Sequence, residues 1–511
     1  MDQTETIDFL KSGAGFEGDD GSDVEVVETH CSVIFLQGDA ALKLKRAVTY
    51  DYLDLSTVDL RHAILDRELE LNRPAAPSIY RDVMPVTRAG DGLALGGDGE
   101  AVDWVLRMNR FPAENELERI AERGDFDDRL ATDTGAAIAR YHEQTPERRQ
   151  PGRAMMADIL DELGRVFAEF PGADGTGRVS EWQDAAARAL DRVGACLDVR
   201  GRDGHVRRAH GDLHLRNLVV IDGRPVPFDA LEFDEDLGTC DLLYDIGFLI
   251  MDLLHRDLDR QGCRVLDAWL RDFRGAQDAG LAALPLFLSV RAAIRAMVQL
   301  QTDAARERAG ASADAVAAYL DLACRALDPG PPRLIAVGGF SGSGKSVLAR
   351  ALAPGLGALP GAVLLSSDLE RKAGQRPDEK LATSDYAPDR RDAVYEAMFD
   401  RAATILDAGH SVILDATFID PALRDEAEAT AARTGVPFSG FWLDAPRDTL
   451  TTRLEARVGD ASDADSSVLM MQLETGTGPL SWQKIDASGT PRATLDQARQ
   501  AMTEVEITGP A

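Results

Sequence analysis

The pattern of apolar and polar positions predicts a small β-rich lobe followed by a larger helical lobe. Before residue 110, short β-branched stretches alternate with turns, and a helical pattern runs up to Pro74. The predicted strands lie in VEVVETHCSVIFLQGDAALKLKRAV, a hairpin around a QGD turn, and in DVMPVTR, LALGG and AVDWVLRM. The predicted helix is VDLRHAILDRELELNR. From about 111 to 328 the pattern is mostly helical, interrupted by the strand-like NLVVIDG and RPVPFDA. We therefore expect an α+β fold with two lobes.

Two stretches rich in Gly, Asp or Pro mark the boundaries of these regions. Residues 1–24 contain GAGFEGDDGSD and predict a flexible segment. DPGPPR, which ends at Arg333, predicts a linker because Pro and Gly cannot continue the preceding helix. After it, helical stretches alternate with the predicted strands RLIAVGGF, AVLLSSD, SVILDATF and FSGFWLDA. This alternation is typical of a parallel sheet. We predict an N-lobe at 25–110, a helical lobe at 111–328 and an α/β domain at 329–511.

Composition narrows the classes of partner. The 511 residues are 44% hydrophobic and carry a net charge of −31, which disfavours nucleic acid and anionic membranes as partners. The five cysteines are scattered without a CxxC pair, which predicts a reducing compartment. The start of the chain does not resemble a signal peptide, and the most apolar run, LLYDIGFLIMDLL, is interrupted by Asp245 and Asp252. We expect a soluble cytoplasmic protein; the oligomeric state stays open.

The α/β region contains the motif GGFSGSGKS, which matches GxxxxGK[ST]. Glycines let successive backbone N–H groups turn toward phosphate oxygens, Lys345 reaches the β- and γ-phosphates, and the Ser346 hydroxyl binds Mg²⁺. An apolar strand precedes the motif and a helix follows it, as a phosphate-binding loop requires. We predict that ATP is bound by Gly339, Ser341, Gly342, Ser343, Gly344, Lys345 and Ser346.

Later motifs in this region predict phosphoryl transfer. SSDLER places Asp368 and Arg371 beyond the second strand, where Asp368 can accept a hydroxyl proton and Arg371 can hold an anion. VILDATF ends the third strand with Asp415, placed to hold Mg²⁺ or its waters. RLEAR puts Arg453 and Arg457 on one helix face, which we interpret as a lid closing over the phosphates. A solvated helix face is the alternative interpretation of these two arginines.

With these motifs, most of 333–490 resembles the small P-loop kinases, namely the shikimate and gluconate kinase group and the kinase domain of polynucleotide kinases. The resemblance implies that Asp368 activates the acceptor hydroxyl. The acceptor-binding segment AGQRPDEKLATSDYAPD departs from every member, so the resemblance does not name the substrate. Residues 331–511 hold 18 Lys and Arg against 26 Asp and Glu, which makes a polynucleotide acceptor the less favoured choice.

A second set of motifs lies in the helical region. AHGDLHLRNLVV matches H-x-D-x-x-x-x-N with His210, Asp212 and Asn217. In kinase catalytic loops this Asp accepts the proton of the substrate hydroxyl, and the Asn binds a metal ion. PFDALEFD then offers Asp229 at the position of a metal-binding Asp. Two alternatives are a metal cluster of His210, Asp212 and His214 and a purely structural role.

The rarity of lysine points to the residue that would hold the nucleotide phosphates. The chain has seven lysines against 49 arginines, and residues 12–344 contain only Lys43 and Lys45. ALKLKR puts both on a predicted third strand, and RELELNR supplies a glutamate to pair with one of them. We predict the pair Lys43 and Glu68, with Lys45 and Glu70 as alternatives.

With these motifs, roughly 25–328 resembles the aminoglycoside phosphotransferase-like branch of the protein-kinase fold, which includes choline, homoserine and sugar kinases. The motifs that carry it are THCSVIFL, ALKLKR, RELELNR, HGDLHLRN, FDALEFD and DLLYDIGFLIMDLL. The resemblance implies a bilobal fold that binds ATP and Mg²⁺. Two features depart from the family: the hairpin has the single glycine Gly38, and Ala230 follows Asp229 in place of Gly or Trp.

The leading prediction is a bifunctional phosphotransferase that uses ATP and Mg²⁺. Each domain would transfer a phosphoryl group to a hydroxyl of a small molecule, by positioning and electrostatics. One alternative is a single C-terminal kinase regulated by a ligand-binding N-terminal domain. Another is a C-terminal ATPase switch, against which Asp368 in the acceptor position argues.

Overall fold

The computed structural model of the chain describes residues 3–16, 23–50, 53–170, 177–306, 310–372, 388–456 and 465–508. It divides into two compact units, and each is described by itself. The first comprises Met1–Leu130, Tyr141–Arg149 and Gly204–Asp245, and the second comprises Ala131–Arg140, Gln150–Asp203 and Ile246–Ala511. The second unit therefore joins helices of the predicted helical lobe to the α/β domain. The predicted boundaries at 110 and 328 stay predictions, because these units group the residues differently.

The first unit is built on a six-stranded antiparallel sheet. Its strands, in spatial order, are β1 (Glu25–Glu28), β2 (Ser32–Gln37), β3 (Ala40–Lys45), β8 (Ala101–Asn109), β6 (Tyr80–Ala89) and β7 (Gly92–Leu95). The predicted strands are confirmed, including the hairpin of β2 and β3. Gly38 takes a positive φ of 52° in its turn, a conformation that glycine adopts without strain.

Helix α2 (Val58–Asn72) covers this sheet and confirms the predicted helix. The hydroxyl of Thr57 accepts a hydrogen bond from the backbone N–H of Leu60 and caps the first turn. Leu65 packs with Tyr80 and Leu106 in one apolar cluster. This packing fixes the buried polar face of α2 relative to the sheet.

Helix α1 (Thr4–Lys11) corrects the prediction of a flexible segment at 1–24. Leu10 is fully buried in the apolar cluster of the N-terminal sheet, together with Phe35 and Leu42. The side chain of Gln3 also hydrogen-bonds the backbone of Lys45 at 2.9 Å. A helix this short gains its stability from such tertiary contacts, which local sequence pattern does not reveal.

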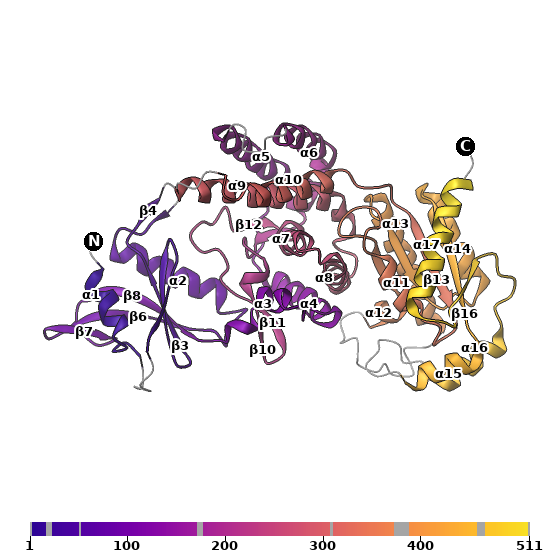
Figure 1. Cartoon of the computed structure of the whole chain (residues 1–511), viewed down its shortest axis with the longest axis horizontal. Helices are drawn as coiled ribbons and strands as arrows, with labels where there is room; N and C mark the ends of the chain where they lie inside the picture. Colours follow the sequence, from indigo (N-terminus) through magenta and orange to yellow (C-terminus); the bar gives the residue numbers. More distant parts are fainter. Residues whose placement is uncertain are drawn as a thin grey trace. The chain divides into compact units, whose positions relative to one another are not determined.

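Shorter elements complete the first unit (Figure 1). They are β4 (Thr49–Tyr50), β5 (Leu53–Asp54), η1 (Ala113–Asn115), α3 (Leu117–Glu122), β9 (Val206–Arg208), η2 (Leu215–Asn217), β10 (Leu218–Ile221), β11 (Arg224–Pro227) and β12 (Thr239–Asp241). Strands β10 and β11 confirm the strand-like pieces NLVVIDG and RPVPFDA, and they pair as a hairpin with positive φ at Asp222 and Gly223 in its turn. This hairpin separates the two motifs that carry the predicted metal-binding residues.

The helical part confirms the predominantly helical pattern of 111–328. Its helices are α4 (Asp128–Gln144), α5 (Gly152–Glu169), α6 (Arg178–Arg202), α7 (Leu242–His255), α8 (Asp259–Asp272), η3 (Asp278–Ala283), α9 (Leu284–Ala305) and α10 (Ala313–Leu327). Among the described residues, the stretch Asp278–Ala305 is long and apolar enough to cross a membrane by length and composition, and 67% of its apolar window is buried inside the protein. Buried core helices share this property, so it is weak support for a membrane span.

The α/β domain lies in the second unit and has a five-stranded parallel sheet. In spatial order its strands are β14 (Val363–Ser366), β15 (Val412–Asp415), β13 (Leu334–Gly339), β16 (Phe438–Asp444) and β17 (Gln483–Asp486). Its helices are α11 (Lys345–Leu352), α12 (Ser367–Arg371), α13 (Pro388–Asp407), α14 (Pro421–Thr434), α15 (Arg447–Glu455), α16 (Ser466–Thr475) and α17 (Pro491–Thr508). Four strands were predicted; β17 was missed, since only one of its four residues is buried.

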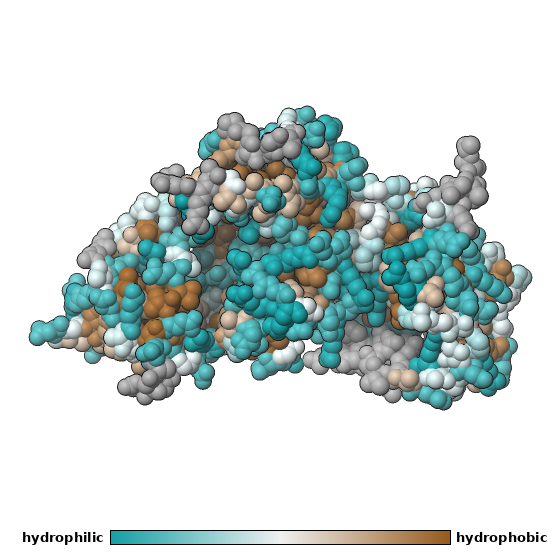
Figure 2. Space-filling model, viewed as in Figure 1, coloured by the Kyte–Doolittle hydropathy of each residue, from teal (hydrophilic) through white to brown (hydrophobic). Residues whose placement is uncertain are grey.

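The core of this domain follows from the alternation of side chains along the strands. Ile335 and Val337 of β13 face a cluster that includes Leu348 of α11 and Ala498 of α17, so both helices pack against one face of the sheet. Most of the visible surface around these helices is hydrophilic, with scattered apolar residues (Figure 2). The central position of β13 places the loop that follows it between the carboxyl ends of β15 and β16.

Candidate functional sites

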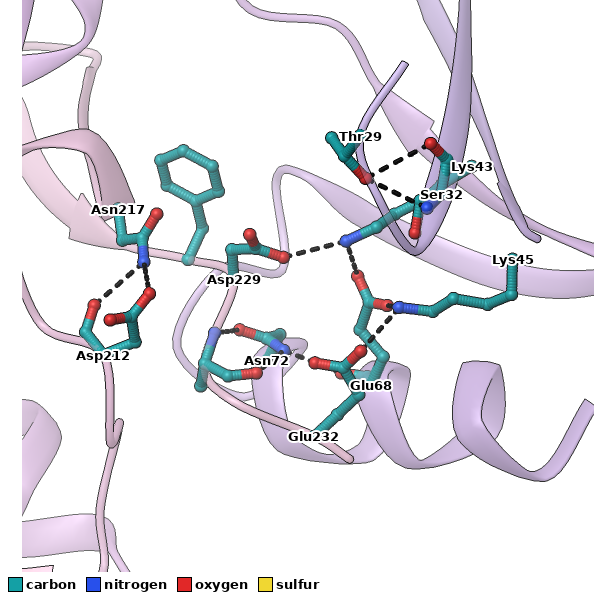
Figure 3. Close-up of polar contacts among 12 residues, drawn as sticks. Thr29, Ser32, Lys43, Lys45, Glu68, Asn72, Asp212, Asn217, Asp229 and Glu232 are labelled. Atoms are coloured by element: carbon teal, nitrogen blue, oxygen red, sulfur yellow. Dashed lines mark hydrogen bonds and ion pairs between the residues drawn. The ribbon is translucent and has the colours of Figure 1, made fainter. Parts of the chain in front are cut away.

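Lys43 and Glu68 meet in the first unit, as predicted from the lysine content (Figure 3). Lys43 Nζ lies 2.7 Å from Glu68 Oε1 and 2.8 Å from Asp229 Oδ1. Burial lowers the pKa of Lys43, but the charges of Asp229 and Glu68 outweigh it and raise this pKa well above its usual value. Burial raises the pKa of Asp229, but the positive charge of Lys43 outweighs burial, so this pKa lies below its usual value. These contacts favour a charged ammonium facing a charged carboxylate.

The two alternative residues behave differently. Lys45 Nζ lies 2.7 Å from Glu68 Oε2 and 2.5 Å from Glu232 Oε1, so Glu68 bridges both lysines. Positions 43 and 45 share one face of β3, because side chains alternate along a strand. Glu70 instead pairs with Arg67 at the surface, since two residues along a helix turn a side chain to the opposite face. The structure therefore brings Glu68, and not Glu70, to the lysines.

The predicted catalytic loop places Asp212 beside Asn217. The Asn217 side-chain amide donates to the backbone carbonyl of Asp212 at 2.8 Å and to its carboxylate Oδ2 at 3.1 Å. Asn217 is buried in η2, whereas the Asp212 side chain is 44% exposed. The amide therefore fixes an accessible carboxylate, which suits a group that accepts a proton from a bound hydroxyl.

Asp245 accepts hydrogen bonds from the backbone of this loop, a role that the sequence analysis missed. Its carboxylate accepts hydrogen bonds from the backbone N–H groups of His210 and Gly211, at 3.0 and 2.9 Å. His142 Nε2 lies 3.0 Å from the same carboxylate. All of Asp245 is buried. An Asp in the apolar run LLYDIGFLIMDLL was the available signal, because a buried carboxylate must be paired.

His210 serves the loop rather than a metal cluster. Its Nε2 lies 2.9 Å from the carbonyl oxygen of Phe228, and burial lowers its pKa despite the nearby charge of Asp245. Within the described ranges, no group of three or more His, Cys, Asp or Glu is arranged to hold a metal ion. The alternative cluster of His210, Asp212 and His214 therefore receives no support.

In the second unit, the loop between β13 and α11 has the backbone of a phosphate-binding loop. Gly339, Gly342 and Gly344 have φ angles of 147°, 84° and 95°. A Cβ on Gly339 would lie 2.7 Å from Ser343 Oγ, and one on Gly342 would lie 2.6 Å from the carbonyl oxygen of Leu450. Side chains at these positions would force the loop apart, so the glycines are required.

The loop is also in contact with α15 and α16. Phe340 packs against a cluster formed by Leu450, Leu454 and Leu469. The backbone N–H of Ser341 donates to Gln472 Oε1 at 2.9 Å. Ser343 Oγ is buried without a hydrogen-bond partner among the described residues. A buried hydroxyl without a partner, in a glycine-rich loop that leads into the N-terminus of a helix, suits an anionic ligand.

Lys345, Ser346 and Asp415 gather at the carboxyl edge of the sheet. Ser346 Oγ donates to Asp415 Oδ2 at 2.6 Å, and Lys345 Nζ donates to the carbonyl oxygen of Phe340 at 3.2 Å. Burial raises the pKa of Asp415, while the charge of Lys345 opposes that shift. The predicted Mg²⁺ pair, Ser346 and Asp415, is thus brought into direct contact.

Asp368 and Arg371 lie on α12, directly after β14, at the same sheet edge. Arg371 Nη1 is 3.0 Å from Asp368 Oδ1, so the two predicted acceptor residues form an ion pair. Of the two predicted lid arginines, Arg453 Nη2 donates to the carbonyl oxygen of Gly489 at 3.1 Å. Arg457 and residues 373–387 of the predicted acceptor segment lie outside the described residues. The lid therefore stays a prediction.

Both sites have donor sets that fit a Mg²⁺–nucleotide complex. Mg²⁺ retains several waters and takes one or two protein ligands besides the phosphates, so it needs no cage of carboxylates. Asn217 and Asp229 would supply these ligands in the first unit, and Ser346 and Asp415 in the second. The unpaired Ser343 hydroxyl supports the fit at the second site.

The chain matches one family model over part of its length, and it is similar over most of its length to proteins that carry no functional name. Residues 334–479 match the family model described as AAA domain, which agrees with the phosphate-binding loop of the α/β domain. Over 93% of its length the chain is 29% identical to proteins of Mycobacterium bovis and Mycobacterium tuberculosis, of which it covers 94%. Both of these relatives carry the name "uncharacterized protein".

Several solved structures resemble parts of the chain. A sugar kinase from Janibacter is 23% identical, with 35% of this chain and 96% of that one covered and a TM-score of 0.25. A gluconokinase from Sinorhizobium meliloti is 21% identical, with 35% and 98% covered and a TM-score of 0.24. A choline/ethanolamine kinase family protein from Mesorhizobium loti is 15% identical, with 63% and 95% covered and a TM-score of 0.35. TM-scores this low do not establish a shared fold or function for this chain.

Proposed function

We propose that this chain is a phosphotransferase with two sites, each dependent on ATP and Mg²⁺. Each site would transfer the terminal phosphoryl group of the nucleotide to a hydroxyl of a small molecule. The observation that carries the proposal is the double contact of Lys43 with Glu68 and Asp229, at 2.7 and 2.8 Å. This arrangement joins a phosphate-binding cation to a metal-binding carboxylate, as kinase chemistry requires.

In the first unit, Lys43 would neutralise phosphate charge while Asp212 orients the acceptor hydroxyl. Mg²⁺, when bound, supplies further neutralisation of the charge that develops on the phosphates. The acceptor oxygen would form the new bond to phosphorus as the bond to the departing diphosphate breaks. The hydroxyl proton would pass to the Asp212 carboxylate, which Asn217 holds at 3.1 Å. Glu68 would keep Lys43 in place during this transfer.

In the second unit, the loop Gly339–Ser346 would bind the phosphates through its backbone N–H groups and Lys345. Asp368 would accept the proton of a second acceptor, and Arg371, paired with Asp368 at 3.0 Å, would hold an anionic part of the substrate. The family match over 334–479 supports nucleotide binding at this site. Arg453 and Arg457 would close over the phosphates as a lid.

The acceptors we propose are small hydroxylated molecules rather than polyanions. The net charge of −31 would repel polyanionic acceptors and concentrate cations near the protein. Nucleic acids and anionic membranes are therefore not proposed as partners.

A second candidate function is favoured by one contact within the second unit. Arg401 of α13 joins Asp278 of η3, at 2.8 Å, to Glu370 of α12, at 2.7 Å. Glu370 lies between Asp368 and Arg371 in sequence, so Arg401 connects η3, which lies in the predicted helical lobe, to the predicted acceptor helix α12. The alternative is a single C-terminal kinase whose activity is regulated through the N-terminal part of the chain.

Acceptor screening by ³¹P NMR tests the proposal and separates the candidates. Wild type, Lys345→Ala, Asp212→Ala and the double variant would each be incubated with MgATP and sugars, amino alcohols, nucleosides or aminoglycosides. Two kinase sites predict two sets of phosphorylated products, one lost in each single variant and both lost in the double variant. If Asp212→Ala leaves every product unchanged, the first unit is not a kinase and the regulatory alternative gains. If no compound in the screen raises the rate of ATP consumption above the rate of ATP hydrolysis by water, both candidate functions are wrong.

A further inference from the structure

The segment that carries Asp229 is held in an uncommon backbone conformation. Asp229 follows β11 with a φ of 59°, in the left-handed region that non-glycine residues avoid. Such a residue persists only where the surrounding structure determines it, and it is typical of functional sites. Ala230 is not among the described residues with positive φ, so the strain falls on Asp229.

Tyr80 of the N-terminal sheet and Asn72 of its helix α2 secure this backbone, and Figure 3 shows the contact made by Asn72. The N–H of Asp229 donates to Tyr80 Oη at 3.0 Å. The N–H of Ala230 donates to Asn72 Oδ1 at 2.7 Å, and its carbonyl accepts from Asn72 Nδ2 at 3.4 Å. The N–H of Leu231 donates to the carbonyl oxygen of His210 at 3.0 Å. Every N–H from 229 to 231 is thus partnered, as buried backbone requires.

Asn72 links this segment to the lysine pair. It lies one helical turn after Glu68 on α2, so both side chains are on the same helix face. Its Nδ2 also donates to the carbonyl oxygen of Glu68 at 3.0 Å. Asn72 and Tyr80 are each only 2% exposed. The amide of Asn72 supplies both a donor and an acceptor at this position, whereas leucine, which is of similar size, supplies neither.

We propose that Asn72 and Tyr80 are positioning residues that lock Asp229 in the conformation that presents its carboxylate to Lys43 and to Mg²⁺. They act through the backbone of Asp229 and Ala230, not through contact with the nucleotide. This inference rests on the proposed function of the first unit, and it names what sets the Mg²⁺-dependent part of nucleotide affinity there.

The test measures ADP binding by calorimetry in the full chain, with and without Mg²⁺. All proteins carry Lys345→Ala, which weakens binding at the second site. The gain in ADP affinity on adding Mg²⁺ is expected to fall about tenfold or more in Asn72→Leu, and less in Tyr80→Phe, as for other residues that orient metal ligands. ADP affinity without Mg²⁺ is expected to stay unchanged. Asn109→Leu is the matched control, because that exposed asparagine only donates to the carbonyl oxygen of Ser78.

Amide hydrogen exchange at 229–231 gives a readout that does not depend on nucleotide. The amides of Asp229 and Ala230 are expected to exchange about tenfold faster or more in Asn72→Leu than in its parent. Unchanged exchange and an unchanged Mg²⁺ gain would overturn the inference, as would an equal loss of ADP affinity with and without Mg²⁺. If the parent shows no Mg²⁺-dependent ADP binding, the proposed function fails at this site and exchange alone decides the inference. If Asn72→Leu does not fold, Tyr80→Phe, which removes one oxygen, decides by the same two readouts.

Discussion

The hydroxyl of Ser346 donates a 2.6 Å hydrogen bond to the carboxylate of Asp415, although 69 positions separate them in the chain. They meet because β13 and β15 are parallel neighbours, so the last residue of β15 and the loop and helix that follow β13 share one sheet edge. Each side chain alone is a weak ligand for a divalent cation. Held together, they would supply the protein ligands of the proposed Mg²⁺ site, and waters and phosphates would supply the others.

Asp415→Asn should therefore change the Mg²⁺ dependence of the second site. The amide preserves the size of the side chain but removes its charge, so the Mg²⁺ concentration for half-maximal product formation should rise about 10- to 100-fold. Product formation against Mg²⁺ concentration measures this shift. Asp444→Asn is the matched control, because Asp444 is an exposed carboxylate at the end of the other neighbouring strand, β16. Equal Mg²⁺ curves for Asp415→Asn and wild type would contradict the assignment.

Lys43 and Lys45 should separate chemistry from stability. Lys43→Met removes the cation that faces Asp229, and we expect first-unit product formation to fall about 100-fold or more, as for loss of a group that stabilises developing charge. Lys45→Met leaves Glu68 and Glu232 with one fewer cation in a buried cluster, and the free energy of unfolding should fall by about 3 to 5 kcal/mol. Urea unfolding and product assays on both variants measure the two effects. The interpretation fails if Lys45→Met unfolds at the wild-type urea concentration.

The sequence could narrow the lysine choice but not complete it. Alternation along a strand puts positions 43 and 45 on one face, so pattern alone left both open, and the structure shows both contacting Glu68. The spacing of Asp212, Asn217 and Asp229 was visible because it follows a known motif. The apolar run around Asp245 indicated a buried and therefore paired carboxylate, but its partners could not be predicted. The role of Asn72 left no signal, and both roles depend on tertiary contacts with distant backbone.

The same limit applies to the fold. β13 and β15 were predicted because every residue in them is buried and the run is apolar. Residues Thr4–Lys11 and β17 were missed, because short elements with few buried residues carry little periodic signal. Buried parallel strands are thus predictable from local pattern, whereas peripheral elements that gain their stability from packing are not.

The contact of Asp278 with Arg401 should be important for the stability of the second unit. Arg401 Nε and Nη2 lie 2.8 and 3.1 Å from the two carboxylate oxygens of Asp278, which is fully buried. Asp278→Asn leaves the guanidinium partly unpaired, and the free energy of unfolding should fall by about 3 to 5 kcal/mol. Because Arg401 also holds Glu370 of α12, second-site product formation should fall more than ADP affinity does.

A double-variant cycle checks that this effect belongs to the pair. Asp278→Asn and Arg401→Met each break the contact, so the double variant should be more stable than the sum of the two losses implies. Urea unfolding of the four proteins gives the coupling energy. Strict additivity would mean that the two side chains stabilise the unit independently, which would contradict the proposed pairing.

His410 should make the second unit sensitive to acid. The ring is fully buried, its Nε2 lies 3.0 Å from the carbonyl oxygen of Leu281, and burial lowers its pKa from 6.5 to about 4. The folded pKa is below the unfolded one, so the unfolded chain takes up the proton first as pH falls. The stability that this group contributes is therefore complete above pH 6.5, and about 3 kcal/mol of it is lost between about pH 6.5 and 4.

The variant His410→Gln tests this prediction, because its side-chain amide can still donate to the carbonyl oxygen of Leu281 but does not titrate. Urea unfolding at pH 7.5 and pH 4 should show that the variant loses about 3 kcal/mol less than wild type, and the comparison removes the contribution of His210 and the carboxylates, which both proteins share. Equal losses in the two proteins would show that His410 is protonated in the folded state as easily as in the unfolded chain.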